Sequence, residues 1–319
     1  MSGSEIPQGV AVTIPESAQG SLSPAAASGP RCLVCGSDGN VRLYQLSRFD
    51  IHRCTACDQV YLFPLPSEAQ IAALFARLYT DGLGDVPELR DYYAACFDAS
   101  PTSPVVRGSR TWLTAIQRHA SGGRLLDIGC GTGIFCHAAE SFGWEVQGID
   151  EAEEAVAFAR EHYGLTIHLG SFESLDVTPE SFDLVTMWDV IEHSRAPRRL
   201  LEEAIRCLKP GGLIAISTPN QRNIMEAVAG PLYRLTGGRA RQPLEKFYLI
   251  QHFLYFSPKT LRRLLVDAGL EIVDFRLEST DLGRLTLHPV MRLGLEALFL
   301  AARPLGLQNR LFAIGRKPA

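Results

Sequence analysis

The sequence lacks any hydrophobic run long enough to cross a membrane. No apolar stretch reaches the roughly 18 residues of a membrane-spanning helix. The N-terminus also lacks a basic segment followed by an apolar one, which argues against a secretory signal. We therefore expect a cytoplasmic protein, in which thiols stay reduced. The eight cysteines are then candidate metal ligands or buried thiols rather than disulfide partners.

A surplus of positive charge is also lacking. The chain has 31 Lys and Arg residues against 35 Asp and Glu residues, which gives a net charge of −4. This balance offers no electrostatic reason for a nucleic-acid partner, and we do not expect one. The hydrophobic content of 46% and the charged content of 21% are typical of a soluble globular protein. A length of 319 residues suffices for one large domain with appendages.

Composition divides the chain into four segments. Residues 1–30 are rich in Ser, Ala, Gly and Pro without periodicity, so we expect a disordered tail. Residues 31–66 form a compact cysteine module. We expect residues 67–120 to be a helical cap or linker that contributes to a substrate pocket. Residues 121–319 carry the longest regular pattern and are expected to form the main domain.

Apolar strands and amphipathic helices alternate through the main domain. Strands are expected near 124–128, 145–149, 166–169, 183–188, 212–218, 271–278 and 309–316. Helices are expected near 105–119, 133–142, 152–162, 196–208, 257–268 and 288–304. This alternation predicts an α/β fold, namely a Rossmann-like, mostly parallel seven-stranded sheet with right-handed crossovers and helices on both faces.

The first of these strands runs into a loop with three glycines. It reads Asp-Ile-Gly-Cys-Gly-Thr-Gly over residues 127–133. Glycines let the backbone approach a ligand and adopt positive φ. The next apolar run ends at Asp150, whose carboxylate can accept hydrogen bonds from both hydroxyls of a ribose. The two features together predict a nucleoside at the carboxyl edge of the sheet.

The same loop disfavours a dinucleotide. A dinucleotide fingerprint requires a third glycine at position 134, which is Ile134 here. The carboxylate of Asp127, just before the loop, would repel a pyrophosphate and suits a cationic ligand.

Five motifs in order resemble the class I S-adenosylmethionine-dependent methyltransferases over roughly residues 110–319. They are the glycine loop, the acid at 150, Gly-Ser-Phe-Glu at 170–173, the fourth-strand segment 182–189, and Lys-Pro-Gly-Gly-Leu at 209–213. The third motif has Ser171 in place of the usual acid, which leaves the adenine contact to Phe172 or Glu173. The resemblance implies the cofactor-binding residues Asp127, Gly129, Cys130, Gly131, Gly133, Asp150, Ser171, Phe172, Trp188 and Asp189.

A group of three polar residues follows the fourth strand. Asp189, Glu192 and His193 would share one face of a helical turn. This pattern resembles the ubiquinone-biosynthesis O-methyltransferases and the small-RNA terminal 2′-O-methyltransferases, although those families have Glu in place of Asp189. The resemblance implies that His252 completes a site for a second divalent metal, which would lower the pKa of a substrate hydroxyl. It makes His193, His252 and Glu192 the candidate catalytic residues.

The alternative interpretation of this group needs no metal. Glu192 then pairs locally, His193 contacts cofactor or substrate, and His252 makes only a loop hydrogen bond. His193 is the first choice for the general base or for a metal ligand, and His252 is the second.

Four cysteines occur as two knuckles. Cys32-x-x-Cys35 and Cys54-x-x-Cys57 are separated by 18 residues. This spacing predicts a zinc ribbon in which the four thiolates bind one ion tetrahedrally. Because four thiolates close the coordination shell, the zinc would be structural.

The resemblance implies that residues 67–120 and 219–256 build the acceptor pocket. Candidate aromatic lining residues are Tyr92, Tyr93, Phe97, Tyr233, Phe247, Tyr248 and Tyr255. Candidate anion-binding residues are Arg222, Arg234, Arg239, Arg241 and Lys246, which a solvated lid would explain equally well. The apolar helix near 288–304 favours core packing or a homodimer contact over a membrane anchor.

Three functions are compatible with these features. The leading one is an enzyme that methylates a small molecule, at oxygen. The second is an RNA methyltransferase whose zinc ribbon grips nucleic acid, although residues 31–66 are not strongly basic. The third is a non-catalytic cofactor-binding protein, against which the intact motifs argue.

Overall fold

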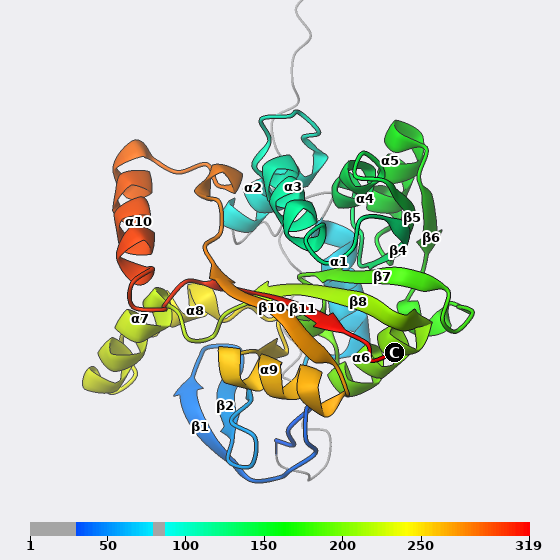
Figure 1. Ribbon diagram of the computed structural model, residues 1–319. Helices are drawn as coiled ribbons and strands as arrows, with labels where there is room; N and C mark the ends of the chain where they lie inside the picture. Colours follow the sequence, from blue (N-terminus) through cyan, green and yellow to red (C-terminus); the bar gives the residue numbers. More distant parts are fainter. Residues whose placement is uncertain (1–29, 79–86) are drawn as a thin grey trace, which may run out of the picture.

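The computed structural model describes residues 30–78 and 87–319 (Figure 1). Nearly all of the segment expected to be a disordered tail lies outside these residues. The main sheet has seven strands, in the order β10 (Glu271–Glu278), β11 (Arg310–Arg316), β8 (Leu208–Pro219), β7 (Phe182–Trp188), β4 (Gly123–Ile128), β5 (Trp144–Asp150) and β6 (Thr166–Leu169). The pairs β8–β7, β7–β4, β4–β5 and β5–β6 are parallel, whereas β11 runs antiparallel to both neighbours. The predicted fold class is confirmed.

Helices cover both faces of this sheet because alternate residues of its central strands point to opposite sides. One cluster of buried residues holds Leu125 and Leu184 together with α3 (Pro104–Ile116), α4 (Ile134–Glu140) and α5 (Glu153–Tyr163). The other holds Leu126 and Val185 with α6 (Pro197–Cys207) and α9 (Pro258–Asp267). Strands apolar on both faces are what a covered parallel sheet requires.

The cysteine module builds a second, antiparallel sheet. Its order is β1 (Asn40–Gln45), β2 (Asp50–Cys54), β3 (Val60–Phe63) and β9 (Leu254–Tyr255). The fourth strand comes from the segment that follows the main sheet's β8. The backbone N–H of Leu62 also donates to the Phe253 carbonyl over 3.0 Å. The module is therefore joined to the main domain through shared backbone hydrogen bonds.

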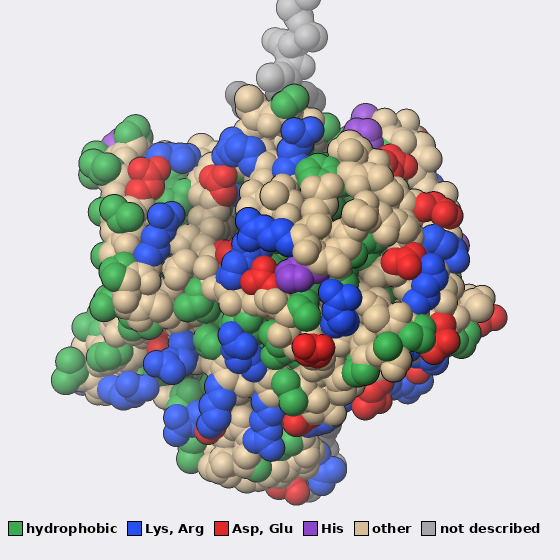
Figure 2. Space-filling view, in the orientation of Figure 1, with side chains coloured by type: hydrophobic (Ala, Val, Ile, Leu, Met, Phe, Trp, Pro, Cys, Tyr) green, Lys and Arg blue, Asp and Glu red, His purple; other side chains and the backbone are tan. Residues whose placement is uncertain are grey.

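The other described elements are α1 (Glu68–Leu78), α2 (Pro87–Ala94), α7 (Ile224–Leu235), α8 (Gln242–Phe247), α10 (Pro289–Ala302), and the 3-10 turns η2 (Ala95–Phe97), η3 (Phe172–Ser174), η4 (Ile191–His193) and η5 (Leu282–Arg284). Helix α10 projects from the sheet beside α7 (Figure 1), and hydrophobic side chains are visible on this lobe at the left of Figure 2. Val290 is 73% and Leu293 69% exposed. Of the two roles expected for this helix, core packing is wrong, because only Ala302 of its residues is buried. No described helix is long and apolar enough to cross a membrane.

Candidate active site

A cavity of about 710 Å³ opens where β4, β5 and β7 end. Parallel strands present their carboxyl ends at one edge, which is where open α/β sheets bind ligands. Helices α1, α2 and α3 contribute to its walls, within the segment expected to cap a substrate pocket. The expected cofactor-binding residues that line it are Asp127, Gly129, Cys130, Gly131, Asp150, Ser171, Phe172, Trp188 and Asp189.

The remaining expected loop residue, Gly133, does not line the cavity. It caps the N-terminus of α4 with φ of 76°, and a Cβ there would lie 2.7 Å from the Cδ1 of Leu165. Gly133 thus permits close packing of the loop rather than close approach of a ligand. The side of the loop that faces the cavity is formed by Gly129, whose φ is 71°, and Gly131, whose φ is 53°.

The Asp150 carboxylate is held in place by the loop backbone. One oxygen accepts from the Gly131 N–H over 2.7 Å, and the other accepts from the Ala152 N–H over 2.9 Å. Burial raises the pKa of Asp150, while these amides work in the opposite direction. Because a carboxylate oxygen has two lone pairs, each can still accept from a ribose hydroxyl.

Asp127 lies fully buried behind the glycine loop. It accepts from the Thr186 hydroxyl over 2.6 Å and from the Cys136 thiol over 3.4 Å. Burial raises its pKa to about 7, despite these two hydrogen bonds. A cationic ligand in the cavity would favour the charged form of this carboxyl.

We expect Asp127→Asn to stabilise the ligand-free protein at pH 8 by a few degrees of Tm, but not at pH 5. The folded-state pKa is raised above the usual unfolded value near 3.9, so the stability that Asp127 contributes is lost as pH rises towards and through 7. Asparagine does not titrate. Thermal melts of both proteins across this pH range test the prediction, and an equal Tm difference at both ends would contradict it.

Asp183→Asn is the matched control with the opposite sign. Burial acts against ionisation of Asp183, but its ion pair with Lys209, at 2.8 Å, holds the pKa below its usual range. The carboxylate therefore stabilises the fold above its unfolded pKa and the effect is lost in acid. Its replacement should lower the Tm at pH 8.

The turn after β7 differs from the expected helical turn. Asp189 adopts φ of 57°, and a 3-10 helix begins only at Ile191. Left-handed backbone at Asp189 directs this residue away from the Glu192–His193 face. Ligand atoms of Glu192, His193 and His252 lie within 4.8 Å of one another, and Asp189 is not in this group.

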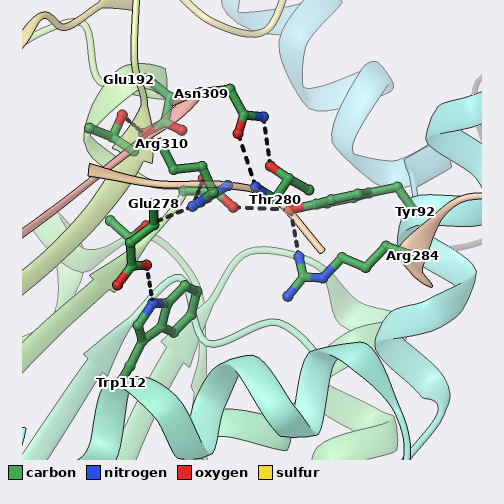
Figure 3. A network of polar contacts seen from close by, with 11 residues as sticks. Tyr92, Trp112, Glu192, Glu278, Thr280, Arg284, Asn309 and Arg310 are labelled. Atoms are coloured by element: carbon green, nitrogen blue, oxygen red, sulfur yellow. Dashed lines mark hydrogen bonds and ion pairs between the residues drawn. The ribbon is translucent and has the colours of Figure 1, made fainter. Parts of the chain in front are cut away.

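Asp189 instead contacts a network of polar residues, of which Tyr92 and Arg310 are labelled in Figure 3. Its Oδ1 accepts from Arg310 over 2.6 Å, and its Oδ2 accepts from the Tyr92 hydroxyl over 3.2 Å. Burial opposes ionisation, but Arg310 and then Arg284 hold its pKa below the usual range. The placement of Asp189 among the metal ligands is therefore corrected, because Arg310 already neutralises it.

Glu192 is almost fully buried, with 1% of its surface exposed. Its Oε2 accepts from the Thr218 hydroxyl over 2.9 Å, while Oε1 has no hydrogen-bond partner among the described residues. Burial, and then the charge of Asp189, raise the pKa of Glu192 to about 8. A buried oxygen without a partner is costly, and a cation or a proton would relieve that cost.

The two histidines lie side by side, with ring centroids 4.9 Å apart. His193 donates from Nδ1 to the Gln251 carbonyl over 2.7 Å, because a carbonyl can only accept. Burial lowers the pKa of His193, and burial together with His193 lowers that of His252 to about 3. Both rings are therefore neutral near pH 7. His193 lines the cavity, whereas Glu192 and His252 do not.

The four cysteines come together as expected. Sγ atoms of Cys32 and Cys57 are 3.6 Å apart, those of Cys35 and Cys54 are 3.5 Å apart, and all four lie within 4.8 Å of one another. Tetrahedral zinc with Zn–S bonds of about 2.3 Å separates its sulfur ligands by about 3.8 Å. The geometry fits a zinc site with four cysteine ligands.

The candidate acceptor residues divide differently from the expectation. Tyr92 and Tyr93 line the cavity, but Phe97 packs on Phe158 with ring centroids 4.9 Å apart. The other aromatic candidates pack against the cysteine module: Tyr233, Phe247, Tyr248 and Tyr255. These tertiary contacts with the cysteine module are not encoded by residue spacing. None of the proposed anion-binding residues in 219–256 lines the cavity.

Sequence reasoning missed the two arginines of the network. Arg310 opens a strand that is otherwise buried and apolar, and only 8% of it is exposed. A charged residue within an apolar strand pattern was the available signal, because buried charges are paired. Arg284, on η5, gave no such signal.

The chain matches the methyltransferase domain family over residues 107–274, and it belongs to this family. It is an S-adenosylmethionine-dependent methyltransferase. It is 31% identical over 174 residues to the ubiquinone biosynthesis O-methyltransferase of Burkholderia pseudomallei (strain 1710b), covering 52% of this chain and 72% of that protein. It is 32% identical over 181 residues to the enzyme of the same name from Azoarcus sp. (strain BH72), covering 54% and 71%. Among solved structures, an S-adenosylmethionine-dependent methyltransferase from Mesorhizobium loti is 20% identical, with a TM-score of 0.47 over 66% of this chain and all of that one.

Proposed function

We propose that this methyltransferase methylates a hydroxyl group of a small-molecule acceptor, with His193 as the general base. The observation that carries the proposal is the position of His193 at the cavity wall with its Nδ1 fixed on the Gln251 carbonyl. This fixes the tautomer, so the basic nitrogen is Nε2. The similarity to ubiquinone biosynthesis O-methyltransferases supports transfer to oxygen.

The cofactor supplies an activated methyl group on a sulfonium, and the residues of this chain position the reactants. Asp150 would bind the ribose, Phe172 and Ser171 would contact the adenine, and the Asp127 carboxylate would favour a cationic ligand. With the acceptor hydroxyl held in line with that methyl group, His193 would take the hydroxyl proton during transfer. Removing that proton and holding the oxygen in line are the protein's contributions to the rate.

We also propose an alternative use of the same site, in which Glu192, His193 and His252 hold a divalent cation. The lone pair of His193 Nε2 then binds the ion, and His193 is no longer the general base. Two imidazoles that are neutral near pH 7 and a carboxyl oxygen without a partner are the donor set that a metal requires. A bound cation would lower the pKa of a hydroxyl beside it. Elemental analysis should find more than the single zinc of the four-cysteine group. Activity indifferent to chelation, with that zinc retained, would remove this part of the proposal.

The cysteine module, residues 31–66, is proposed to be a zinc ribbon that positions the segment bearing His252. Strand β3 pairs with β9 at Val60–Tyr255 and Tyr61–Leu254, immediately after that histidine. The Gln59 side chain adds a donor to the Tyr255 carbonyl over 3.0 Å. In this proposal the ribbon positions the segment bearing His252, and no nucleic-acid ligand is required to explain it.

Asp150→Ala tests the cofactor site. We expect binding of S-adenosylhomocysteine, measured by calorimetry, to weaken by about 10- to 100-fold, the range for losing hydrogen bonds to a charged group. Glu153→Ala is the control, because this residue lies one turn further on, in the first turn of α5, and does not line the cavity. No binding by the unmodified protein would contradict the assignment of the cavity itself.

Incubating the protein with a metabolite extract and isotope-labelled S-adenosylmethionine would identify the acceptor by mass spectrometry. We expect label on the oxygen of a small molecule. Label on nitrogen or carbon, or on RNA alone, would contradict the proposed function while leaving the cofactor site intact.

A further inference from the structure

The β10–β11 connection contributes one residue, Arg284, to the wall of the cavity. It spans 279–309 and carries η5 and α10 (Figure 1). Asp281 binds Arg107 of α3 over 2.6 Å and caps η5 by accepting from the Gly283 N–H. This anchoring fixes η5 beside α3, so that Arg284 lines the cavity.

Arg284 is held by one aromatic residue. Its Nη1 donates to the Tyr92 hydroxyl over 2.6 Å, and its guanidinium carbon lies 4.9 Å from the centre of the Tyr92 ring (Figure 3). Tyr92 in turn donates to Asp189 over 3.2 Å, which uses its only proton. The guanidinium is thus oriented without being neutralised by Tyr92.

The charges of the network do not balance at Arg284. Arg310 pairs with Asp189 over 2.6 Å. Among the described residues, no carboxylate lies within ion-pair distance of Arg284. A half-buried guanidinium keeps its charge, and an unpaired one at a cavity wall is stabilised by an anionic ligand. Its planar donor groups match the two oxygens of a carboxylate.

We propose that Arg284 binds a carboxylate of a ligand in this cavity. The inference rests on the proposed function and names one chemical group that its site binds. That carboxylate has two possible sources. One is the amino-acid end of the cofactor, and the other is the acceptor. Tyr92 positions the guanidinium. It lines the cavity together with Asp189, where the cofactor and the acceptor would meet.

Calorimetry of Arg284→Gln distinguishes these sources. S-adenosylhomocysteine and 5′-methylthioadenosine share the nucleoside thioether, but only the former has a carboxylate. If the cofactor is the source, the variant should lose about 10- to 100-fold in affinity for S-adenosylhomocysteine and little for 5′-methylthioadenosine. Arg284→Lys, which keeps the charge, should lose less.

If the acceptor is the source, both nucleosides should bind the variant normally. Native protein saturated with S-adenosylhomocysteine should then bind benzoate in preference to benzamide, and Arg284→Gln should lose that preference. Arg303→Gln, at the exposed end of α10, is the control for removing a positive charge from this connection.

Tyr92→Phe separates ligand binding from a purely structural role. Tyr92→Phe removes the hydroxyl that orients the guanidinium but keeps the ring and the charge of Arg284, so the proposal expects a smaller loss than in Arg284→Gln. If Arg284 only holds Tyr92, the two variants should lose equally in every assay, and the proposal is then wrong. It is also overturned if Arg284→Gln alters neither the nucleoside contrast nor benzoate binding. Failure of the native protein to bind S-adenosylhomocysteine would instead contradict the cofactor site and the proposed function.

Discussion

Methyl transfer by His193→Asn is expected to be about 10²- to 10⁴-fold slower than by the native protein, the usual contribution of a positioned base. Asparagine places an N–H donor where the imidazole has Nδ1, so the bond to the Gln251 carbonyl can persist. The proton acceptor is lost. Single-turnover rates with labelled S-adenosylmethionine, on the acceptor found by mass spectrometry, measure the effect.

Binding of S-adenosylhomocysteine separates a catalytic defect from a structural one. It should change by less than about threefold in His193→Asn, because Asp150 and the glycine loop are held by their own backbone bonds. His288→Asn, at the exposed N-cap of α10, is the control that removes an imidazole elsewhere. A His193 variant that transfers methyl groups at the native rate would exclude this residue as the base.

Cys54→Ser is expected to remove the zinc and to slow methyl transfer by more than about tenfold. The effect would be indirect, because no cysteine of the group lines the cavity. Structural zinc supplies much of the folding energy of a small ribbon. Without it β3 loses its support, and β9 loses its partner. The carbonyl that orients His193 belongs to Gln251, just before β9.

Hydrogen exchange gives this prediction a readout besides activity. Amides of 251–256 should lose protection in Cys54→Ser, while those of β4 and β5 keep theirs. Cys207→Ser is the matched control: the same chemical change in another buried cysteine, packed in the main core and outside the ribbon. Loss of zinc with unchanged protection of 251–256 would show that the fold of this segment does not depend on the ribbon.

Much of the cofactor site follows from local sequence. Loop 127–133 and Asp150 come directly after strands, and strands that alternate with helices must form a parallel sheet whose carboxyl ends share one edge. The sequence alone therefore places Asp127, Gly129 and Asp150 at one cavity. The knuckle spacing likewise brings the thiols together in pairs, because each pair is closed by its own tight turn.

The polar network beside the cavity could not be predicted in this way. Its residues come from α2, from η5 and from β11, which are separated by long stretches of chain, and no periodicity specifies which of them meet. Asp189 shows that helical spacing can misplace a side chain even within a single turn. Helical spacing placed it with Glu192, but its left-handed backbone and the guanidinium of Arg310 take it into another network.

The sequence by itself determined the fold class, the nucleoside-binding edge and the paired cysteine knuckles, since each depends on residues close in the chain. Only the tertiary structure decided that β9 joins the cysteine module to the segment bearing His252, that Arg310 neutralises Asp189, and that Arg284 faces the cavity with no carboxylate partner among the described residues. These are contacts between distant segments. Their free energy comes from burial and charge pairing in the folded state, which no local pattern records.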